Sequence, residues 1–172
     1  MNLASLSTSD WQGRAARARY ETRHFIDGNF VDSVKKGRFN VVNPATGTVL
    51  CEVSAGTKED IDLAVAAARK AYYSRVWSRK APRERMAVLA AFSRLIKENT
   101  ERFALLDTLC MGKPITDMVT IDVPAAALNF AYFGELIDKI DGQVTATAQD
   151  AFHYILREPR SEEHTSELQS PC

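Results

Sequence analysis

The chain of 172 residues is 45% hydrophobic and 26% charged, which is typical of a folded domain of ordinary size and disfavours general disorder. Its 22 basic residues balance its 22 acidic residues, so no net charge attracts nucleic acid or an anionic membrane, and both partners are disfavoured. No stretch approaches the roughly 20 apolar residues of a membrane span, and no secretory signal opens the chain, so a cytoplasmic protein is expected.

The N-terminal part of the chain is predicted to hold one helix followed by two short antiparallel strand pairs. The helix covers WQGRAARARY, residues 11–20, whose arginines also resemble a mitochondrial transit peptide, although the flanking acidic residues favour a surface helix. In HFIDGNFV, Asp27 and Gly28 lie between β-prone residues, which is typical of a type I′ hairpin. The second strand pair, residues 39–42 and 48–53, is joined by the turn sequence NPATG.

Four helices are predicted next, each from apolar residues with helical spacing. The first follows Thr57 as N-cap, the second begins near Pro82, the third ends at Gly112, and the fourth runs from about Pro124 to Gly142. Residues 143–159 favour one or two strands. The apolar stripes are expected to be core faces: Ile61, Val65, Ala68 and Tyr72; Met86, Leu89, Phe92 and Ile96; Phe103, Leu106, Leu109 and Cys110; and Leu128, Tyr132, Leu136 and Ile140.

No motif with a defined chemistry is present: the sequence has no glycine-rich nucleotide loop, zinc-protease pair, nucleophile elbow or metal-spaced Cys/His cluster. His24 and His153 lie in strand-like segments, where a hydrogen-bonded or exposed imidazole is expected. A carboxylate pair for acid–base catalysis could be formed among Asp107, Asp117 and Asp122, but nothing in the sequence fixes the separation that such catalysis needs. They are therefore interpreted as helix-surface and capping groups. The residues by themselves therefore indicate no catalytic, cofactor-binding or metal-binding site.

Two further features have a functional and a simpler interpretation. The cysteines Cys51, Cys110 and Cys172 are odd in number and widely spaced, which indicates reduced thiols, and the first two are interpreted as packed side chains rather than nucleophiles. The basic stretch RVWSRKAPRER, residues 75–85, contains an aromatic residue and is a weak indication of nucleic-acid binding. A solvated loop that enters a helix is the favoured interpretation.

Six segments, in order, closely resemble the opening of the NAD(P)-dependent aldehyde dehydrogenases: FIDGNFV, NPATGTVLCEV, AVAAARKAYY, WSRKAPRERMAVLAAFSRLIKEN, LLDTLCMGKPI and FAYFGELIDKIDG. The resemblance covers residues 25–159 and is greatest to the bacterial γ-glutamyl-γ-aminobutyraldehyde dehydrogenases of putrescine breakdown. It implies an α/β fold in which residues 1–142 are the N-terminal part of the coenzyme-binding domain and residues 143–159 begin the oligomerisation strands. Most of the parallel sheet of that domain is expected to follow ILREP.

The resemblance also implies the reaction of the full-length enzyme. In the family, a cysteine thiolate attacks the aldehyde, hydride passes to NAD or NADP, and water activated by a glutamate releases the carboxylic acid. The family's nucleophile, glutamate and coenzyme-binding segments come after the position reached by ILREP, and neither Cys51 nor Cys110 matches the nucleophile. This chain is therefore expected to be inactive, and the full-length enzyme is expected to be a homodimer or homotetramer.

One departure from the family concerns a monovalent cation site. The usual Leu-Asp-Thr-Gly-Lys-Pro appears here as LCMGKP, residues 109–114, so Cys110 stands in place of the Asp. Some family members bind a cation with that Asp and with carbonyl groups that match Val41 and Val42. The replacement argues against such a site in this chain.

The C-terminal segment RSEEHTSELQSPC, residues 160–172, departs from the family pattern, which continues Val-Gly-Val after Arg-Glu-Pro. RSEEHTSELQS is also the translation, in one frame, of a common sequencing-library adapter. Residues 160–172 are therefore interpreted as an artefactual or disordered tail, with Arg160 assignable either way. The alternative is a metal site formed by Glu162, Glu163, His164 and Cys172, which a tail without anchoring contacts disfavours.

A function from a different class remains as an alternative to an enzyme fragment. Without the parallel strands, the apolar stripes are expected to face water and the chain is expected to fold poorly. The alternative is a stand-alone helical interaction module that binds full-length subunits. That function requires a soluble chain that unfolds cooperatively.

Overall fold

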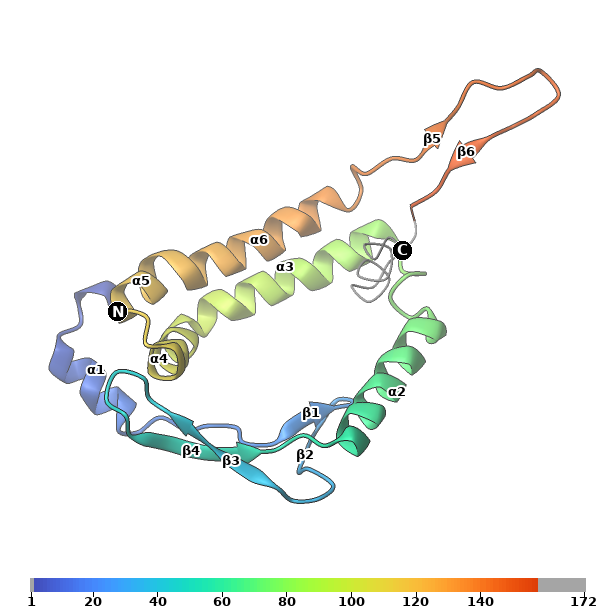
Figure 1. Ribbon diagram of the computed structural model, residues 1–172. Helices are drawn as coiled ribbons and strands as arrows, with labels where there is room; N and C mark the ends of the chain where they lie inside the picture. The colour runs from blue at the N-terminus through green and yellow to red at the C-terminus, as the bar shows by residue number, and fades with distance from the viewer. Residues whose placement is uncertain (1, 158–172) are drawn as a thin grey trace, which may run out of the picture.

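The structure is a computed structural model, and residues 2–157 of it are described. The interpretations of residues 158–172, including the tail and its metal ligands, lie outside the described residues. Helices and short antiparallel strand pairs follow one another along the chain, which confirms the predicted α/β class (Figure 1). None of the described helices is long and apolar enough to cross a membrane.

The N-terminal helix is shorter than predicted. A 3-10 turn, η1 (Leu3–Ser5), precedes α1 (Thr8–Ala15). Asp10 and Ser7 form a capping box, in which each backbone N–H donates to the side chain of the other residue. After Ala16 the backbone N–H groups donate to the carbonyl three residues earlier instead of four, and the helix ends. Arg17 and Arg19, which were predicted to be helical, therefore lie in the connection that follows.

Both predicted hairpins form. The first pairs β1 (His24–Ile26) with β2 (Asn29–Val31), and the second pairs β3 (Arg38–Val42) with β4 (Val49–Ser54). Asp27 and Gly28 have φ angles of 49° and 78°, as a type I′ turn requires, so this prediction is confirmed. A register shift between Val41 and Val42 interrupts the second ladder.

The four helices predicted after the hairpins are present, with two additions, and the fourth ends at Leu136 rather than at Gly142. They are α2 (Lys58–Ser74), α3 (Pro82–Glu98), α4 (Thr100–Met111) and α6 (Val123–Leu136). Gly112 ends α4 with a φ of 76°, a left-handed conformation that glycine adopts without strain. The short helix α5 (Ile115–Asp117) and the π turn η2 (Met118–Asp122) were not predicted, and they extend the helical path into α6.

The last strands form a separate hairpin. Residues of β5 (Gln143–Val144) pair with β6 (Tyr154–Ile155), in agreement with the predicted one or two strands. This hairpin projects away from the helices in Figure 1. Among the described residues it pairs with no other strand.

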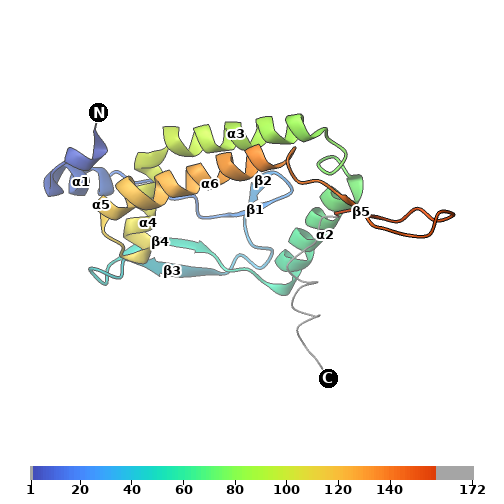
Figure 2. The same ribbon diagram turned by 90° about the horizontal axis from the view of Figure 1, so that it is seen from above.

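The core lies where α3 and α6 run side by side in opposite directions, close to α4 (Figures 1 and 2). Gly134 permits this approach, because a Cβ atom added there would lie 3.1 Å from the Cβ of Leu89. Ser93 strengthens the contact, since its Oγ donates a 2.7 Å hydrogen bond to the carbonyl of Ala127. The buried apolar cluster consists of Ile96, Ala104, Met118, Val123 and Ala127.

The apolar stripes predicted for α6 and α2 are not buried among the described residues. On α6 the packed positions are Val123, Ala127 and Gly134, whereas Leu128 and Tyr132 of the predicted stripe are 64% and 54% exposed. On α2 the stripe is also exposed, with Ile61 at 61%. The spacing identified both helices correctly, but the described chain places no partner against these faces. Their exposure agrees with the expectation that the stripes face water.

A polar contact anchors the start of α2 instead. The carboxylate of Asp60 is only 4% exposed and accepts hydrogen bonds from the Ser33 hydroxyl at 2.8 Å and the Val34 N–H at 2.9 Å. It also accepts from the backbone N–H and the hydroxyl of Thr57, at 2.8 and 2.9 Å. The bond from Val34, followed by those from Ser33 and Thr57, lowers the pKa of Asp60 well below its usual value.

Candidate functional site

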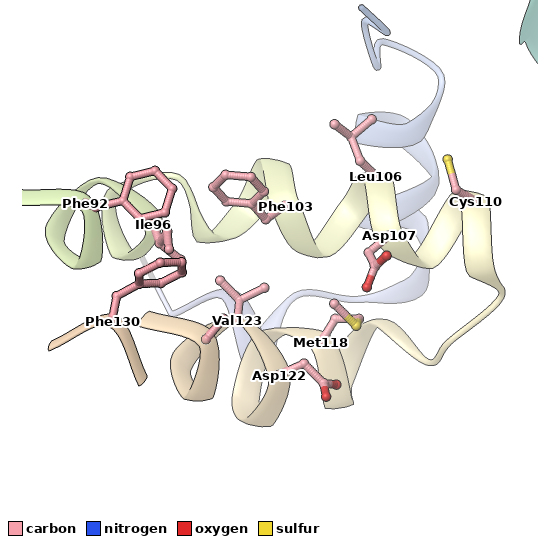
Figure 3. Close-up of a pocket in the computed structure, with 11 residues that line it drawn as sticks. Phe92, Ile96, Phe103, Leu106, Asp107, Cys110, Met118, Asp122, Val123 and Phe130 are labelled. Carbon is pink, nitrogen blue, oxygen red and sulfur yellow. The ribbon is translucent and has the colours of Figure 1, made fainter. Parts of the chain in front are cut away.

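An open apolar groove between α3, α4 and the η2–α6 segment is the candidate site (Figure 3). Its volume is about 600 Å³, within the range of small-molecule sites. Helical spacing places apolar side chains of three helical segments on the same surface. They line the groove together with two carboxylates and one thiol: Phe92, Ile96, Phe103, Leu106, Asp107, Cys110, Met118, Asp122, Val123, Ala126 and Phe130.

Aromatic rings form one end of the groove. The rings of Phe92 and Phe130 meet edge to face across α3 and α6, with centroids 4.5 Å apart. Phe92 and Phe103 were predicted to be core residues, yet they are 46% and 48% exposed. They pack on one side only, so the groove is an apolar face that stays open in the described chain.

Charged side chains lie at the other end. Asp107 of α4 and Asp122 of η2, predicted as separate surface groups, line the same groove, whereas Asp117 does not. The Asp122 carboxylate lies 2.6 Å from the Nζ of Lys113, and the hydrogen bond from Lys113 raises the pKa of this lysine. Because Asp122 is paired with Lys113, the groove does not present two free carboxylates side by side for general acid–base work.

The thiol at the groove does not have the environment of a nucleophile. Partial desolvation by the surrounding protein atoms raises the pKa of Cys110, and the neighbouring Cys51 and Asp107 raise it further. A raised pKa keeps the group as a thiol at neutral pH, which disfavours attack on a carbonyl. The expectation that Cys110 is packed is wrong, because α4 buries Ala104 and Leu105 and leaves Cys110 exposed on another side.

Neither of the two described histidines lines the groove. His153 is exposed, and its Nδ1 is hydrogen-bonded at 2.5 Å to the hydroxyl of Thr145, as predicted. His24 of β1 is partly buried near Gly56, and its Nε2 has no hydrogen-bond partner among residues 2–157. Neither histidine is beside a cysteine or serine that it could activate in the groove.

The described residues do not fit the cation site of some family members. Cys51 pairs with Val41 across the second hairpin, and Cys110 interacts electrostatically with Cys51, so the replaced Asp position is indeed near this hairpin. It offers a neutral thiol where a hard cation prefers oxygen ligands. Within residues 2–157, no group of three or more His, Cys, Asp or Glu side chains is arranged to hold a metal ion.

Sequence reasoning missed the η2 side of the groove. Met118, Val123 and Ala126 line it, but the segment before Pro124 was not predicted to be helical. A signal was available, because Ile115, Met118 and Val119 continue the helical spacing backwards from α6. The π turn shifts this spacing by one residue, which obscures the pattern.

The pattern of the aldehyde dehydrogenase family matches residues 30–161. Among curated proteins, the NADP/NAD-dependent aldehyde dehydrogenase PuuC of Escherichia coli is 36% identical over 149 residues, which are 87% of this chain and 30% of that protein. The alignment thus leaves most of that relative's length outside this chain.

Solved structures give the same result. The γ-glutamyl-γ-aminobutyraldehyde dehydrogenase of Burkholderia cenocepacia is 42% identical with a TM-score of 0.80, over 83% of this chain and 29% of that one. A variant of the indole-3-acetaldehyde dehydrogenase of P. syringae, in complex with NAD+ and IAA, is 38% identical with a TM-score of 0.83, over 86% and 30%. The chain therefore spans about a third or less of the length of the relatives that it matches.

Proposed function

Because the chain belongs to the aldehyde dehydrogenase family, we propose that it is part of an enzyme that oxidises an aldehyde to its carboxylic acid with NAD or NADP. The observation that carries this proposal is the family match over most of the chain, supported by the common fold of the solved relatives. One of those relatives was solved with NAD+ bound. In the enzyme, the coenzyme would accept the hydride, and the residues of this chain would form the outer part of its binding domain.

The proposed division of the chain follows the fold. Residues 1–142 would be the N-terminal part of the coenzyme-binding domain, and residues 143–159 would begin the strands through which subunits associate. The projecting β5–β6 hairpin supports this division, because its backbone edges pair with nothing else among the described residues. We expect the full-length enzyme to be a cytoplasmic homodimer or homotetramer, which size-exclusion chromatography and cell fractionation would test.

The substrate proposed for the full-length enzyme is an aminoaldehyde, with γ-glutamyl-γ-aminobutyraldehyde as the leading candidate in polyamine breakdown. The support is the likeness to a dehydrogenase of that name. Comparison of kcat/KM for this compound and for an unsubstituted aliphatic aldehyde of similar length tests the assignment. A preference for the aliphatic aldehyde would contradict it while leaving aldehyde oxidation intact.

We propose that the 172-residue chain does not catalyse this reaction by itself. Cys51 is partly buried in β4, and the raised pKa of Cys110 disfavours its thiolate, so neither thiol is suited to attack an aldehyde. The experiment is to supply the purified chain with NAD or NADP and the aldehyde and to follow NADH or NADPH formation. No turnover is expected, and turnover that Cys51→Ser or Cys110→Ser removes would overturn the proposal.

Residues 160–172 are proposed to be foreign to the enzyme. The support is the change from the family pattern after Pro159 and the identity of RSEEHTSELQS with a translated adapter. Resequencing of independent genomic DNA past codon 159 tests this directly. A Val-Gly-Val continuation is expected, and recovery of the RSEEHTSELQS codons would contradict the proposal.

The alternative function, a helical module that binds full-length subunits, is favoured by one observation. The groove and the exposed stripes of α2 and α6 leave large apolar faces without a partner in the described chain. The module predicts a soluble chain with a cooperative thermal transition that co-elutes with full-length enzyme. The enzyme-fragment proposal predicts aggregation without such a transition.

A further inference from the structure

A second pocket, of about 590 Å³, lies between the connection that follows α1 and the start of α4. It is separate from the apolar groove apart from Leu106, which lines both. Its charged lining combines four arginines with two glutamates: Arg14, Arg17, Arg19, Arg102, Glu98 and Glu101. Such a concentration of guanidinium groups is notable in a chain whose basic and acidic residues are equal in number.

Both glutamates of the pocket already have cationic partners. Glu101 contacts the guanidinium of Arg14, which also lies 5.8 Å from the ring centroid of Trp11. Glu98 pairs with Arg94 on α3 at 2.8 Å. The Arg14–Glu101 pair joins α1 to α4, and the two pairs leave the remaining positive charge of the pocket uncompensated.

The remaining arginines are available to a ligand. Within residues 2–157, no ion pair or side-chain hydrogen bond engages Arg17, Arg19 or Arg102, and all three are exposed. Two belong to the connection after α1 and one to the first turn of α4, so separate segments converge on one pocket. Guanidinium groups that converge in this way suit phosphate, which accepts paired hydrogen bonds from each fork.

The start of α4 adds backbone donors to the same pocket. No side chain caps this helix, because the Nδ2 of Asn99 instead donates a 2.8 Å hydrogen bond to the carbonyl of Leu95. The first-turn N–H groups of a helix have no partner inside the helix and carry partial positive charge. Asn99, Glu101 and Arg102 line the pocket, so the uncapped end of α4 faces the arginines.

We propose that this pocket binds the linked phosphate groups of a small phosphorylated metabolite, such as a nucleoside diphosphate. Three uncompensated guanidinium groups and an uncapped helix start match a ligand with two or more negative charges better than a single carboxylate. The volume suffices for a compound of that size. The site involves neither aldehyde oxidation nor the apolar groove, so it stands or falls independently of the proposed function.

Trp11 provides the measurement. The chain has two tryptophans, and Trp77→Phe leaves Trp11, which is 8% exposed and adjacent to Arg14, as the only one. The monodisperse fraction of this variant from gel filtration is titrated with pyrophosphate, ADP and adenosine at an ionic strength of about 0.15 M, with fluorescence and calorimetry in parallel. Pyrophosphate and ADP are expected to bind saturably and adenosine is not. Binding of ADP without pyrophosphate would show that the base, not the phosphates, is recognised.

Matched double variants separate a site from general charge attraction. Arg17→Gln with Arg102→Gln is expected to weaken pyrophosphate binding by about tenfold or more, since each removes a charge-assisted hydrogen bond. Arg69→Gln with Arg79→Gln changes the net charge equally outside the pocket, and affinity should not change. Equal loss of affinity in the two double variants would overturn the proposal, and so would the absence of binding heat in the Trp77→Phe parent. Red-shifted Trp11 emission from that parent would show that α1 is detached from α4, which would also overturn it.

Discussion

The contact between α3, α4 and α6 and the attachment of α2 show two ways in which helices of this chain are held. In the first region, helices bury a shared apolar cluster that includes Met118 and Ala127. In the second, α2 exposes its apolar stripe, including Ile61 at 61%, and is fixed at its first turn by the buried carboxylate of Asp60. A stripe with helical spacing thus produces burial only where the chain also supplies a facing surface.

The difference predicts different sensitivities to mutation. Removal of apolar volume should matter in the cluster, where the side chains are buried, and hardly at all on α2, where water already covers the stripe. Removal of a polar acceptor should matter most at Asp60, because four donor contacts depend on it. Four changes test this contrast, and local amide hydrogen exchange measures each of them without a requirement for global two-state unfolding.

The largest effect is expected from Met118→Ala. Met118 is 4% exposed, so truncation leaves a cavity that should lower the local opening free energy of α4 and α6 by about 2–4 kcal/mol. Met111→Ala is the matched control. Because Met111 is 73% exposed, its truncation should change the local opening free energy by less than about 0.5 kcal/mol. Equal responses of the two variants would show that the cluster is not packed.

The next effect is expected from Asp60→Asn. With an NH2 group in place of Oδ2, the Ser33 hydroxyl and the N–H and hydroxyl of Thr57 lose their acceptor, whereas the remaining oxygen can still accept from the Val34 N–H. Exchange in the first turn of α2 should increase about tenfold or more. Asp62→Asn, which changes an exposed partner of Lys58, is the control and should leave that turn protected.

The same carboxylate predicts a pH dependence. Because the folded-state pKa of Asp60 lies below the unfolded value of about 3.9, its contribution to stability is complete above that pH and is lost as the pH falls through the lower folded value. Protection of the first turn of α2 should therefore persist below pH ~4 in the parent chain. Loss of this protection near neutral pH would contradict the hydrogen bonds that lower the pKa.

A comparable effect is expected from Gly134→Leu. The new side chain would meet Leu89, whose Cβ is 3.1 Å from the position of a Cβ at residue 134, and would push α6 away from α3. This overpacking should lower the local opening free energy of both helices, measured by amide exchange, by about 1–3 kcal/mol. Gly13→Leu on α1 is the control, because nothing lies within 4 Å of a Cβ there.

The smallest effect on stability is expected from Ile61→Glu. The side chain is already exposed, so the local opening free energy of α2 should change by less than about 0.5 kcal/mol. Removal of exposed apolar surface should instead reduce light scattering at high protein concentration. A large loss of protection would show that the stripe is covered in solution, in conflict with its exposure in the structure.

The elements of this fold could be predicted where the signal was local. Asp27 and Gly28 specify their turn through the positive φ angles that they tolerate, and Gly112 ends α4 for the same reason. The candidate groove could not be predicted as a site. It depends on contacts between α3, α4 and η2 that join residues far apart in the chain, and no periodic pattern specifies which helices meet.

The amino-acid sequence by itself determined the family of this chain and the order of its helices and hairpins, because those depend on motifs and on interactions between near neighbours. Only the tertiary structure decided which faces are buried, that Asp60 anchors α2, and that Arg17, Arg19 and Arg102 meet at the uncapped start of α4. The physical reason is that burial and charge convergence require a partner surface. That partner is selected by the packing of distant segments and not by the spacing of residues within one of them.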